Sequence, residues 1–368
     1  MKTIRVPLKE RSHDIIIGRG VLNSAGRLLK KLKLGSDAYI ITNARVKALY
    51  GQPLEKSLRR SGISAKFKLV ADSERSKSIE NAAEIIRNLA AYDGKKKVFI
   101  IALGGGVIGD LAGFAASIYK RGVPYIQIPT TLLAQVDSAI GGKTAIDLKE
   151  GKNLAGAFYQ PRLILSDINC LKSLSARQIK TGLAEAVKYG IIKDKALFRY
   201  LEENHKKILA GDEAALEFIV YRCSRIKAGI IVQDEREIKH IRTILNFGHT
   251  IGHAIETAGT YRGYNHGEAV ALGMLCAKDI SLSLKLINRQ VSGRIEDLIR
   301  ALGLPAEIKK APLKKIIEAH YHDKKFAGRK NRFVLIKGNN THPVIKENIP
   351  LGLIEETIKN RMYNNTRR

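Results

Sequence analysis

The chain of 368 residues has no tryptophan, only three cysteines and few aromatic side chains, which make up 6% of the sequence. Cys170, Cys223 and Cys276 are odd in number and far apart, so we expect reduced thiols in the core rather than disulfides or a zinc knuckle. The shortage of aromatic residues, together with 32 glycines, favours an α/β enzyme over a β-sandwich.

The sequence also lacks an uninterrupted apolar run long enough to cross a membrane. Its longest apolar stretch, residues 98–118, is broken by Asp110 and by several glycines, which is typical of a strand, a loop and a helix. The N-terminus, MKTIRVPLKERSHD, has charges where a secretory signal needs an apolar core. We therefore expect a soluble cytoplasmic protein.

Acidic residues are scarce. The chain has 35 Asp and Glu residues and 64 Lys and Arg residues, which gives a formal net charge of +29. Such an excess is compatible with a nucleic-acid partner, an anionic substrate or a lysine-rich surface. The basic residues form scattered pairs without interleaved aromatic residues, and no DNA-binding motif is recognisable. We therefore favour a solvated basic surface and expect neither a nucleic-acid nor a membrane partner.

The hydrophobic pattern divides the chain into two domains. Strand-like runs at 37–43, 97–104, 125–131 and 162–167 alternate with helical patterns, which predicts parallel βαβ units in a Rossmann-like nucleotide-binding α/β domain over residues 1–173. From residue 174 to 368, apolar residues at spacings of three and four predict a mainly helical domain, with one strand-like run in NRFVLIKG. The fold class is therefore α/β plus α, and a cleft between domains is a preferred ligand site.

A glycine-rich loop follows the apolar run KVFIIAL. Gly104, Gly106 and Gly109 satisfy GxGxxG just before a predicted helix, where backbone amides can approach a pyrophosphate. The acidic residue that usually binds the ribose about 20 residues later is missing, because no Asp or Glu lies between Leu111 and Val136. The loop alone is a weak signal, and any ribose contact must come from elsewhere.

The next segment, QIPTTLLAQVDSAIGGKTAIDLKEGKNLAGAFYQP, is dense in small and polar residues. Its threonines end a predicted strand, where parallel sheets place their ligands. Lysines in its glycine-rich parts, which we expect to be flexible loops, suit phosphate or carboxylate recognition, although solvated surface lysines are the alternative. The candidates are Thr130, Thr131, Asp137, Lys143, Lys152 and Asn153.

The helical half contributes three histidines within a short stretch. His249 and His253 are one helical turn apart in LNFGHTIGHAIE, and His266 follows in YNHGEAV. With Glu185 of GLAEAVKYGII they could form a zinc site of three protein ligands, but spacing does not decide which residues bind, and one histidine could be a general base or simply pack. Glu185 and Lys188 could equally form an ordinary i,i+3 salt bridge.

The segment before the histidines carries further polar groups, and Arg242 and Asn246 lie one helical turn apart. Basic and amide groups beside a metal suggest an anionic, hydroxylated substrate. The candidates are Lys227, Glu237, Arg242 and Asn246.

Taken in order, these strings resemble the 3-dehydroquinate synthase family of sugar phosphate cyclases across nearly the whole chain. The resemblance is carried by GGGVIGDLAGF, RGVPYIQIPTTLLAQVDSAIGGKT, GKNLAGAFYQP, GLAEAVKYGII, LNFGHTIGHAIE, HGEAVALGM and HDKKFAGRKNRFVL. It implies a nucleotide-binding domain, a helical domain, a homodimer, bound NAD and a divalent metal, Zn²⁺ or Co²⁺.

The resemblance also implies roles for individual residues. Glu185, His249 and His266 match the metal ligands, His253 matches an acid/base residue and Glu237 another proton acceptor. Positions that bind substrate match Arg121 (across a dimer interface), Lys143, Asn153, Lys188, Lys227, Arg242, Asn246 and either Lys324 or Lys325. Positions that bind NAD match Asp72, Glu74, Lys77, Gly106, Val107, Ile108, Gly109, Asp110, Thr130, Thr131, Asp137, Lys143, Lys152, Cys170, Leu171, Lys172 and Ser173.

The implied reaction converts 3-deoxy-D-arabino-heptulosonate 7-phosphate to 3-dehydroquinate and phosphate, in the shikimate pathway towards chorismate and the aromatic amino acids. NAD takes a hydride, phosphate leaves, the hydride returns and an intramolecular aldol step closes the ring, so the enzyme is a phosphorus-oxygen lyase. The chain departs from the family pattern at Asn43, where Asp is common, and at Ser73, where Gly is usual.

Three alternatives differ in testable ways. Another sugar phosphate cyclase, such as a 2-deoxy-scyllo-inosose synthase, would not need Lys227 and Arg242 to bind a substrate carboxylate. A metal-dependent polyol or alcohol dehydrogenase would release NADH at each turnover. A nucleic-acid-binding protein would show salt-dependent binding without requiring His249 or Glu185.

Overall fold

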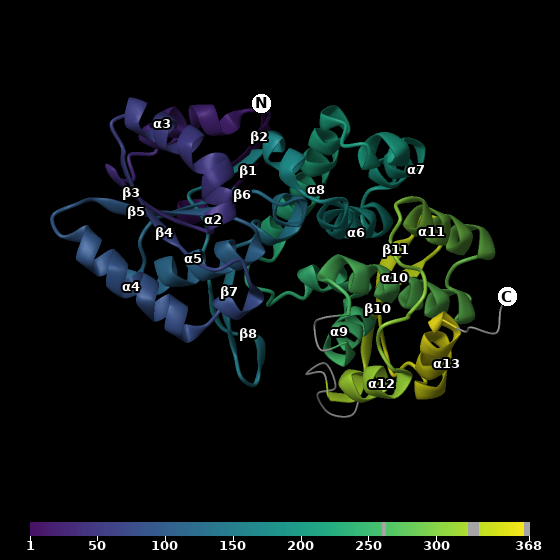
Figure 1. Cartoon of the computed structure of the whole chain (residues 1–368). Helices are drawn as coiled ribbons and strands as arrows, with labels where there is room; N and C mark the ends of the chain where they lie inside the picture. The colour runs from purple at the N-terminus through teal and green to yellow at the C-terminus, as the bar shows by residue number, and fades with distance from the viewer. Residues whose placement is uncertain (260–262, 323–330, 364–368) are drawn as a thin grey trace. The chain divides into compact units, whose positions relative to one another are not determined.

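The computed structural model describes residues 1–259, 263–322 and 331–363 (Figure 1). Its contacts define two compact units: unit 1 comprises Met1–Ser175 and Leu216–Arg236, and unit 2 comprises Ala176–Ala215 and Glu237–Arg368. Most of helix α8 (Glu213–Gln233) thus belongs to unit 1, although its sequence resembles the helical half. The Ser224 hydroxyl of α8 donates to the Gln135 carbonyl, which ties the helix to unit 1. The domain boundary between residues 173 and 174 stays a prediction.

Unit 1 is built on a seven-stranded sheet in the order β1-β2-β9-β6-β5-β3-β4. Every neighbouring pair is parallel except β1 and β2. The four strands expected from the sequence are confirmed as β3, β5, β6 and β9. The strands are β1 (Lys2–Val6), β2 (His13–Gly18), β3 (Asp37–Thr42), β4 (Ser64–Leu69), β5 (Val98–Gly104), β6 (Tyr125–Pro129) and β9 (Leu163–Asp167).

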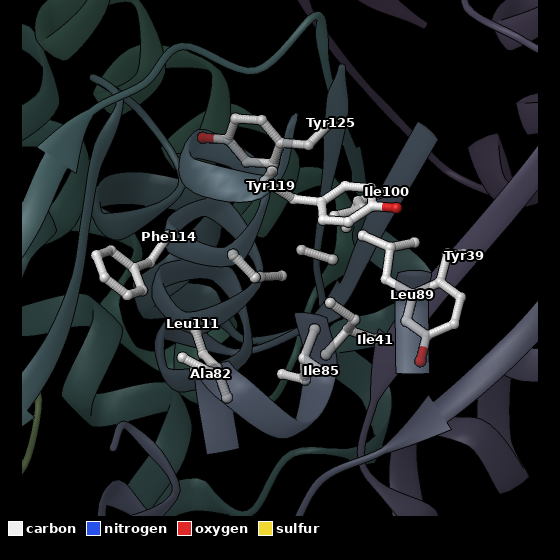
Figure 2. Packing of buried hydrophobic residues seen from close by; sticks show 14 of the residues in the cluster. Tyr39, Ile41, Ala82, Ile85, Leu89, Ile100, Leu111, Phe114, Tyr119 and Tyr125 are labelled. Atoms are coloured by element: carbon white, nitrogen blue, oxygen red, sulfur yellow. The ribbon is translucent and has the colours of Figure 1, made fainter. Parts of the chain in front are cut away.

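Helices cover both faces of this sheet, because alternate residues of its buried strands point to opposite sides. Phe99 and Ile101 of β5 pack in the cluster formed with α1 and α3, whereas Ile100 and Ala102 pack against α4 and α5. Figure 2 shows residues of the second cluster, among them Ile100 of β5 and Leu89 of α4. The helices and short turns of unit 1 are η1 (Lys9–Arg11), η2 (Val21–Ser24), α1 (Ala25–Lys31), α2 (Ala44–Val46), η3 (Lys47–Gly51), α3 (Gln52–Arg60), η4 (Glu74–Ser76), α4 (Ile79–Asp93), α5 (Gly106–Ile118), η5 (Tyr119–Arg121), η6 (Ala134–Ser138) and η7 (Ile168–Ser173).

The segment around Lys143 and Lys152 corrects one expectation. We expected flexible glycine-rich loops, but β7 (Lys143–Leu148) and β8 (Gly151–Phe158) pair as an antiparallel hairpin. A Cβ on Gly156 would lie 2.2 Å from the Thr144 carbonyl oxygen, so glycine here allows close approach of the strands. Both lysines are therefore held on an ordered β-ribbon.

Unit 2 is mainly helical, as expected, with α10 packed against α6, α9, α11 and α13. This helix is buried along nearly its whole length, consistent with its apolar composition. The strand predicted in NRFVLIKG is confirmed as β10, which pairs with β11. The elements are α6 (Ala176–Ile192), α7 (Lys195–Leu209), η8 (Ile241–Asn246), α9 (His249–Ala258), α10 (His266–Ser283), α11 (Arg289–Ala301), α12 (Leu313–His322), β10 (Arg332–Lys337), β11 (His342–Glu347) and α13 (Leu351–Arg361).

Two expectations from composition can also be compared with the structure. Cys170, Cys223 and Cys276 are buried free thiols, as predicted. Among the described residues, none of the helices combines the length and the apolar character needed to span a bilayer.

Candidate active site

Three helices of unit 2 meet closely because glycines line their contacts. A Cβ on Gly273 of α10 would lie 1.9 Å from the carbonyl oxygen of Gly248, which precedes α9, and a Cβ on Gly267 would lie 2.3 Å from the carbonyl oxygen of Thr181 in α6. Gly248 itself has φ of +80°, a left-handed conformation that favours glycine. These contacts pack α10 both against the start of α9 and against α6.

The N-terminus of α10 is anchored by its own sequence. The Asn265 side chain accepts a hydrogen bond from the Glu268 amide (2.9 Å), and the Glu268 carboxylate accepts one from the Asn265 amide (2.9 Å), which completes a capping box. Arg177 of α6 donates two hydrogen bonds of 2.7 Å to Glu268. The cap and this ion pair fix the position of His266, the first residue of the helix.

Glu185, His249 and His266 converge at the meeting point of the three helices. The Oε1 atom of Glu185 lies 3.5 Å from the Nε2 atom of each histidine. The glutamate is completely buried, and neither carboxylate oxygen has a hydrogen-bond partner of normal geometry among the described residues, although Lys188 forms an ion pair with it. One nitrogen or oxygen ligand atom from each of the three residues lies within 4.8 Å of the others, as a shared metal ion requires.

In both histidines the Nδ1 atom has a hydrogen-bond acceptor nearby, and the Nε2 atom faces Glu185. The Nδ1 atom of His249 lies 3.3 Å from the Phe247 carbonyl oxygen, and that of His266 lies 3.3 Å from the Glu256 carboxylate. A carbonyl or carboxylate accepts a proton from Nδ1, so the lone pair of the neutral ring is at Nε2. This is the tautomer that a metal ligand uses.

Electrostatics differ among the three residues. Burial opposes ionisation of Glu185, but Lys188 and the two histidines outweigh it and hold its pKa well below the ordinary value. Burial and the Lys188 charge lower the pKa of His249. For His266, burial is outweighed by the interactions of its two ring nitrogens with the Glu185 and Glu256 carboxylates, which raise its pKa to about 10. The buried Glu185 carboxylate thus has two cationic partners, Lys188 and His266, whereas the low pKa of His249 keeps that ring neutral.

His253 lies beside this cluster and is exposed. Its ring centroid is 5.4 Å from that of His249 and 6.2 Å from that of His266. His253, Glu256 and His266 form a second group of possible ligand atoms among the described residues. The division of labour, with His253 as acid/base residue and not ligand, therefore stays a prediction.

Substrate-side candidates of unit 2 precede the histidines in the chain. Arg242 of η8 is 4% exposed, and its Nε lies 3.2 Å from the Glu237 carboxylate. Glu237 has a left-handed backbone with φ of +59°, which costs about 1–3 kcal/mol for a residue other than glycine. Asn246 ends η8, three residues before His249.

In unit 1, most of the predicted nucleotide residues follow the carboxyl ends of parallel strands. This is where open α/β sheets bind ligands. The predicted nucleotide residues lie in the segments that follow four strands. Three of these strands, β9, β6 and β5, are neighbours in the sheet, and the fourth, β4, is an edge strand. The residues are Asp72, Glu74 and Lys77 after β4; Gly106, Val107, Ile108, Gly109 and Asp110 after β5; Thr130 and Thr131 after β6; and Cys170, Leu171, Lys172 and Ser173 after β9.

The start of α5 has the geometry of an anion-binding helix terminus. The first bond of the helix runs from the Gly109 amide to the Gly105 carbonyl (3.0 Å), so the amides just before Gly109 have no partner one turn earlier within the helix. A Cβ on Gly106 would lie 3.1 Å from the Ser138 hydroxyl, and one on Gly105 would lie 3.2 Å from Thr131. The glycines thus bring the loop backbone close to the turn after β6.

The turn η7 offers fewer side chains than expected. Cys170 and Leu171 are buried in the core, so only their backbone could face a ligand. The Tyr50 hydroxyl lies 2.6 Å from the Ser173 hydroxyl and 3.0 Å from the Cys170 carbonyl oxygen. Lys172 and Ser173 are therefore the polar side chains of this segment.

The remaining predicted residues of unit 1 fall in three places. Lys227 of α8 donates to the carboxylate (2.8 Å) and to the carbonyl (2.7 Å) of Asp137, which joins a predicted substrate residue to a predicted nucleotide residue. Arg121 ends η5 with φ of +62°. Lys143, Lys152 and Asn153 lie on the β7–β8 hairpin.

Comparison with known proteins covers most of the chain. The family model of the 3-dehydroquinate synthase N-terminal domain matches residues 67–181, and that of the C-terminal domain matches residues 182–326. A 3-dehydroquinate synthase from Syntrophotalea carbinolica is 44% identical over 359 residues, which cover 98% of this chain and 99% of the relative. The chain belongs to the 3-dehydroquinate synthase family. The resemblance inferred from the motifs is confirmed.

Solved structures of related cyclases agree with this family. A 2-deoxy-scyllo-inosose synthase complexed with carbaglucose-6-phosphate, NAD⁺ and Co²⁺ has a TM-score of 0.87 at 26% identity, covering 98% of this chain and all of that chain. A 2-epi-5-epi-valiolone synthase from Streptomyces hygroscopicus with NAD⁺ and Zn²⁺ bound has a TM-score of 0.86 at 28% identity, covering 96% and 98%. The α/β plus α fold class is therefore confirmed.

Sequence reasoning missed several residues that shape the family's candidate site. Glu256, which contacts His266, lies three residues after His253 on the same helix face, a spacing that could have signalled it. The capping box was readable as N-x-x-E before an apolar run.

Asn43 and Ser73, the two departures from the family pattern, both cap short turns. Their side chains accept hydrogen bonds from the amides of Val46 and Arg75. Lys324 and Lys325 lie outside the described residues.

Proposed function

We propose that this chain catalyses the reaction of its family, the conversion of 3-deoxy-D-arabino-heptulosonate 7-phosphate to 3-dehydroquinate and inorganic phosphate. The observation that carries the proposal is the assembly of Glu185, His249 and His266 by three separate helices. The reaction class is that of a phosphorus-oxygen lyase, because the hydride taken up is returned and the net change is phosphate elimination with ring closure. The step belongs to the shikimate pathway.

The chemistry of the donor set fits a divalent metal. Glu185 offers buried carboxylate oxygens, and each histidine presents Nε2 towards them. One carboxylate and two imidazoles are a common catalytic zinc set that leaves a position for substrate, and Co²⁺ accepts the same ligands. When bound, such a metal supplies Lewis acidity towards a substrate hydroxyl. Glu256 would orient His266 through Nδ1.

Unit 1 supports binding of NAD. The amides at the start of α5 and the polar residues after β4, β6 and β9 are suited to a pyrophosphate and its flanking groups. NAD supplies the hydride acceptor and later the hydride donor. The chain's part in this step is to hold the dinucleotide in one orientation.

Cationic and amide side chains would hold the substrate. Its phosphate, carboxylate and hydroxyls need donors in fixed positions, and the buried side chains of Lys188, Lys227 and Arg242 would provide some of them without large reorganisation. His253, exposed beside the metal cluster, would move a proton at a substrate hydroxyl, and Glu237 is a second acceptor. The proposed binding residues are Arg121, Lys143, Asn153, Lys188, Lys227, Arg242 and Asn246.

The test is an assay of phosphate release from the heptulosonate phosphate with NAD, before and after chelation. The proposal predicts equimolar phosphate and dehydroquinate without net NADH, and loss of both after metal removal. Net NADH accumulation would instead indicate a dehydrogenase. Turnover of a cyclase substrate that lacks the carboxylate, in preference to the heptulosonate, would indicate another cyclase.

A homodimer and a cytoplasmic location complete the proposal. Light scattering coupled to gel filtration measures the first, and fractionation of cells measures the second. A monomer with full activity would exclude the role of Arg121 across an interface.

A further inference from the structure

Lys77 of unit 1 has more contacts than a nucleotide-binding lysine needs. Its side chain is 4% exposed, and its Nζ donates to the Asp110 carboxylate at 2.9 Å and to Oδ1 of Asn153. The carboxylates of Glu74 and Asp147 lie 3.7 Å and 3.9 Å away. One buried ammonium group therefore joins the loop after β4, the start of α5 and the β7–β8 hairpin.

The hairpin is also tied to Lys77 through the backbone. The Asp147 amide donates to the Lys77 carbonyl at 2.7 Å, and the Asp147 carboxylate accepts from the Asn153 amide at 2.8 Å. Asn153 has φ of +55°, a conformation that needs support from its surroundings in a residue other than glycine. The position of Asn153 is thus determined by Lys77 and Asp147 together.

The contact with Lys77 decides which way the Asn153 amide faces. An ammonium group has donors and no acceptor, so Oδ1 of the asparagine must face Lys77. The Nδ2 group of Asn153 then points away from Lys77. Because Asn153 is exposed, the two N–H donors of this group are accessible to a ligand. Oxygen atoms of a phosphate or a hydroxyl are suitable acceptors for these donors.

We propose that Lys77 is a positioning residue for the substrate: it fixes the orientation of the Asn153 amide and so couples the nucleotide-binding loop to substrate binding. This inference rests on the proposed function, which assigns Asn153 to the substrate. It goes beyond a nucleotide contact, because Lys77 acts on the substrate through Asn153.

A double-mutant cycle tests the coupling. The variants are Lys77→Met, Asn153→Ala and their combination. For each variant, substrate KM and kcat are measured at saturating NAD, and the NAD dissociation constant is measured separately. Loss of a hydrogen bond involving a charged group changes binding roughly ten- to hundredfold. We expect each single variant to raise substrate KM by about tenfold or more, and the double variant to resemble the worse single variant. Independent effects that multiply in the double variant would overturn the inference.

Two further variants guard against a folding defect. Asn153→Asp keeps oxygen acceptors for Lys77 but has no N–H donor, so its substrate KM should rise as in Asn153→Ala while NAD affinity is retained. An unchanged KM would contradict the proposed orientation. Lys149→Met removes one positive charge from the exposed turn of the same hairpin and should leave KM and kcat as in the parent.

A readout independent of activity is cleavage of the hairpin by trypsin. Lys149 lies in its turn and Lys152 follows the turn in β8. Loss of the Lys77 anchor in Lys77→Met should accelerate cleavage there, whereas Lys149→Met should leave cleavage at Lys152 unchanged. Equal cleavage rates in Lys77→Met and the parent would remove the structural basis of the inference. If the parent itself makes no dehydroquinate, the proposed function fails; if it is active and the cycle is additive, only the inference fails.

Discussion

Replacement of Gly273 by alanine should disrupt the metal site without changing any candidate ligand. The added Cβ would lie 1.9 Å from the Gly248 carbonyl oxygen and 2.7 Å from the Gly252 nitrogen, and both atoms belong to backbone. A C···O contact normally needs about 3.3 Å, so the start of α9 must move away from α10 by roughly 1.4 Å. Metal–ligand distances tolerate only about 0.2 Å.

Two measurements quantify the effect. Overpacking of this kind costs about 1–3 kcal/mol, which lowers the melting temperature by roughly 2–12 °C. Because the chain has no tryptophan, melting is followed by circular dichroism of the helices, in protein stripped of metal. Zinc affinity, measured by competition with a chromophoric chelator, should fall at least about tenfold, since His249 and His266 lie on the two helices that separate.

Gly293→Ala is the matched control. Gly293 lies inside helix α11, and a Cβ there would have nothing within 4 Å. Alanine should therefore stabilise the helix by up to about 1 kcal/mol and leave zinc affinity unchanged. Parental zinc affinity and melting temperature in Gly273→Ala would refute the argument that close helix approach assembles the site.

Three other predictions concern single side chains. His249→Ala should lose metal, whereas His253→Ala should keep metal and lose rate; equal metal content after dialysis would refute this division. Glu185→Gln leaves Lys188 buried without its partner and should lower the free energy of unfolding by about 3–5 kcal/mol. Adding Lys188→Met should restore most of the stability in urea unfolding but should not restore zinc binding. A double variant as unstable as Glu185→Gln alone would contradict this. The pKa of Glu296 is held well below its ordinary value, chiefly by the hydrogen bond from an arginine of α13. Because a depressed pKa stabilises the fold above the unfolded-state value and this gain is lost as pH falls, Glu296→Gln should cost about 1.5–3 kcal/mol at pH 7 and progressively less below about pH 4, as measured by urea unfolding across pH.

The local elements of the chain could be predicted because their causes are local. Apolar runs that end in small or polar residues predicted β3, β5, β6 and β9, and apolar residues at spacings of three and four predicted the helices of unit 2. The β7–β8 hairpin was mistaken for loops, because its glycines suggest flexibility while the pairing that orders them joins two separate segments. The pairing of two consecutive strands across a tight turn leaves little trace in either strand alone.

The sequence by itself determined the types of chemical group in the candidate site and their order along the chain, including two histidines on one face of α9. Only the tertiary structure decided that Glu185 faces His249 and His266, that Glu256 contacts His266, and that Lys77 meets Asn153. Helical spacing reports which residues share one face of one helix, but it does not say which other helix meets that face. That choice depends on how closely backbones can approach, and here glycines such as Gly273 set the distance.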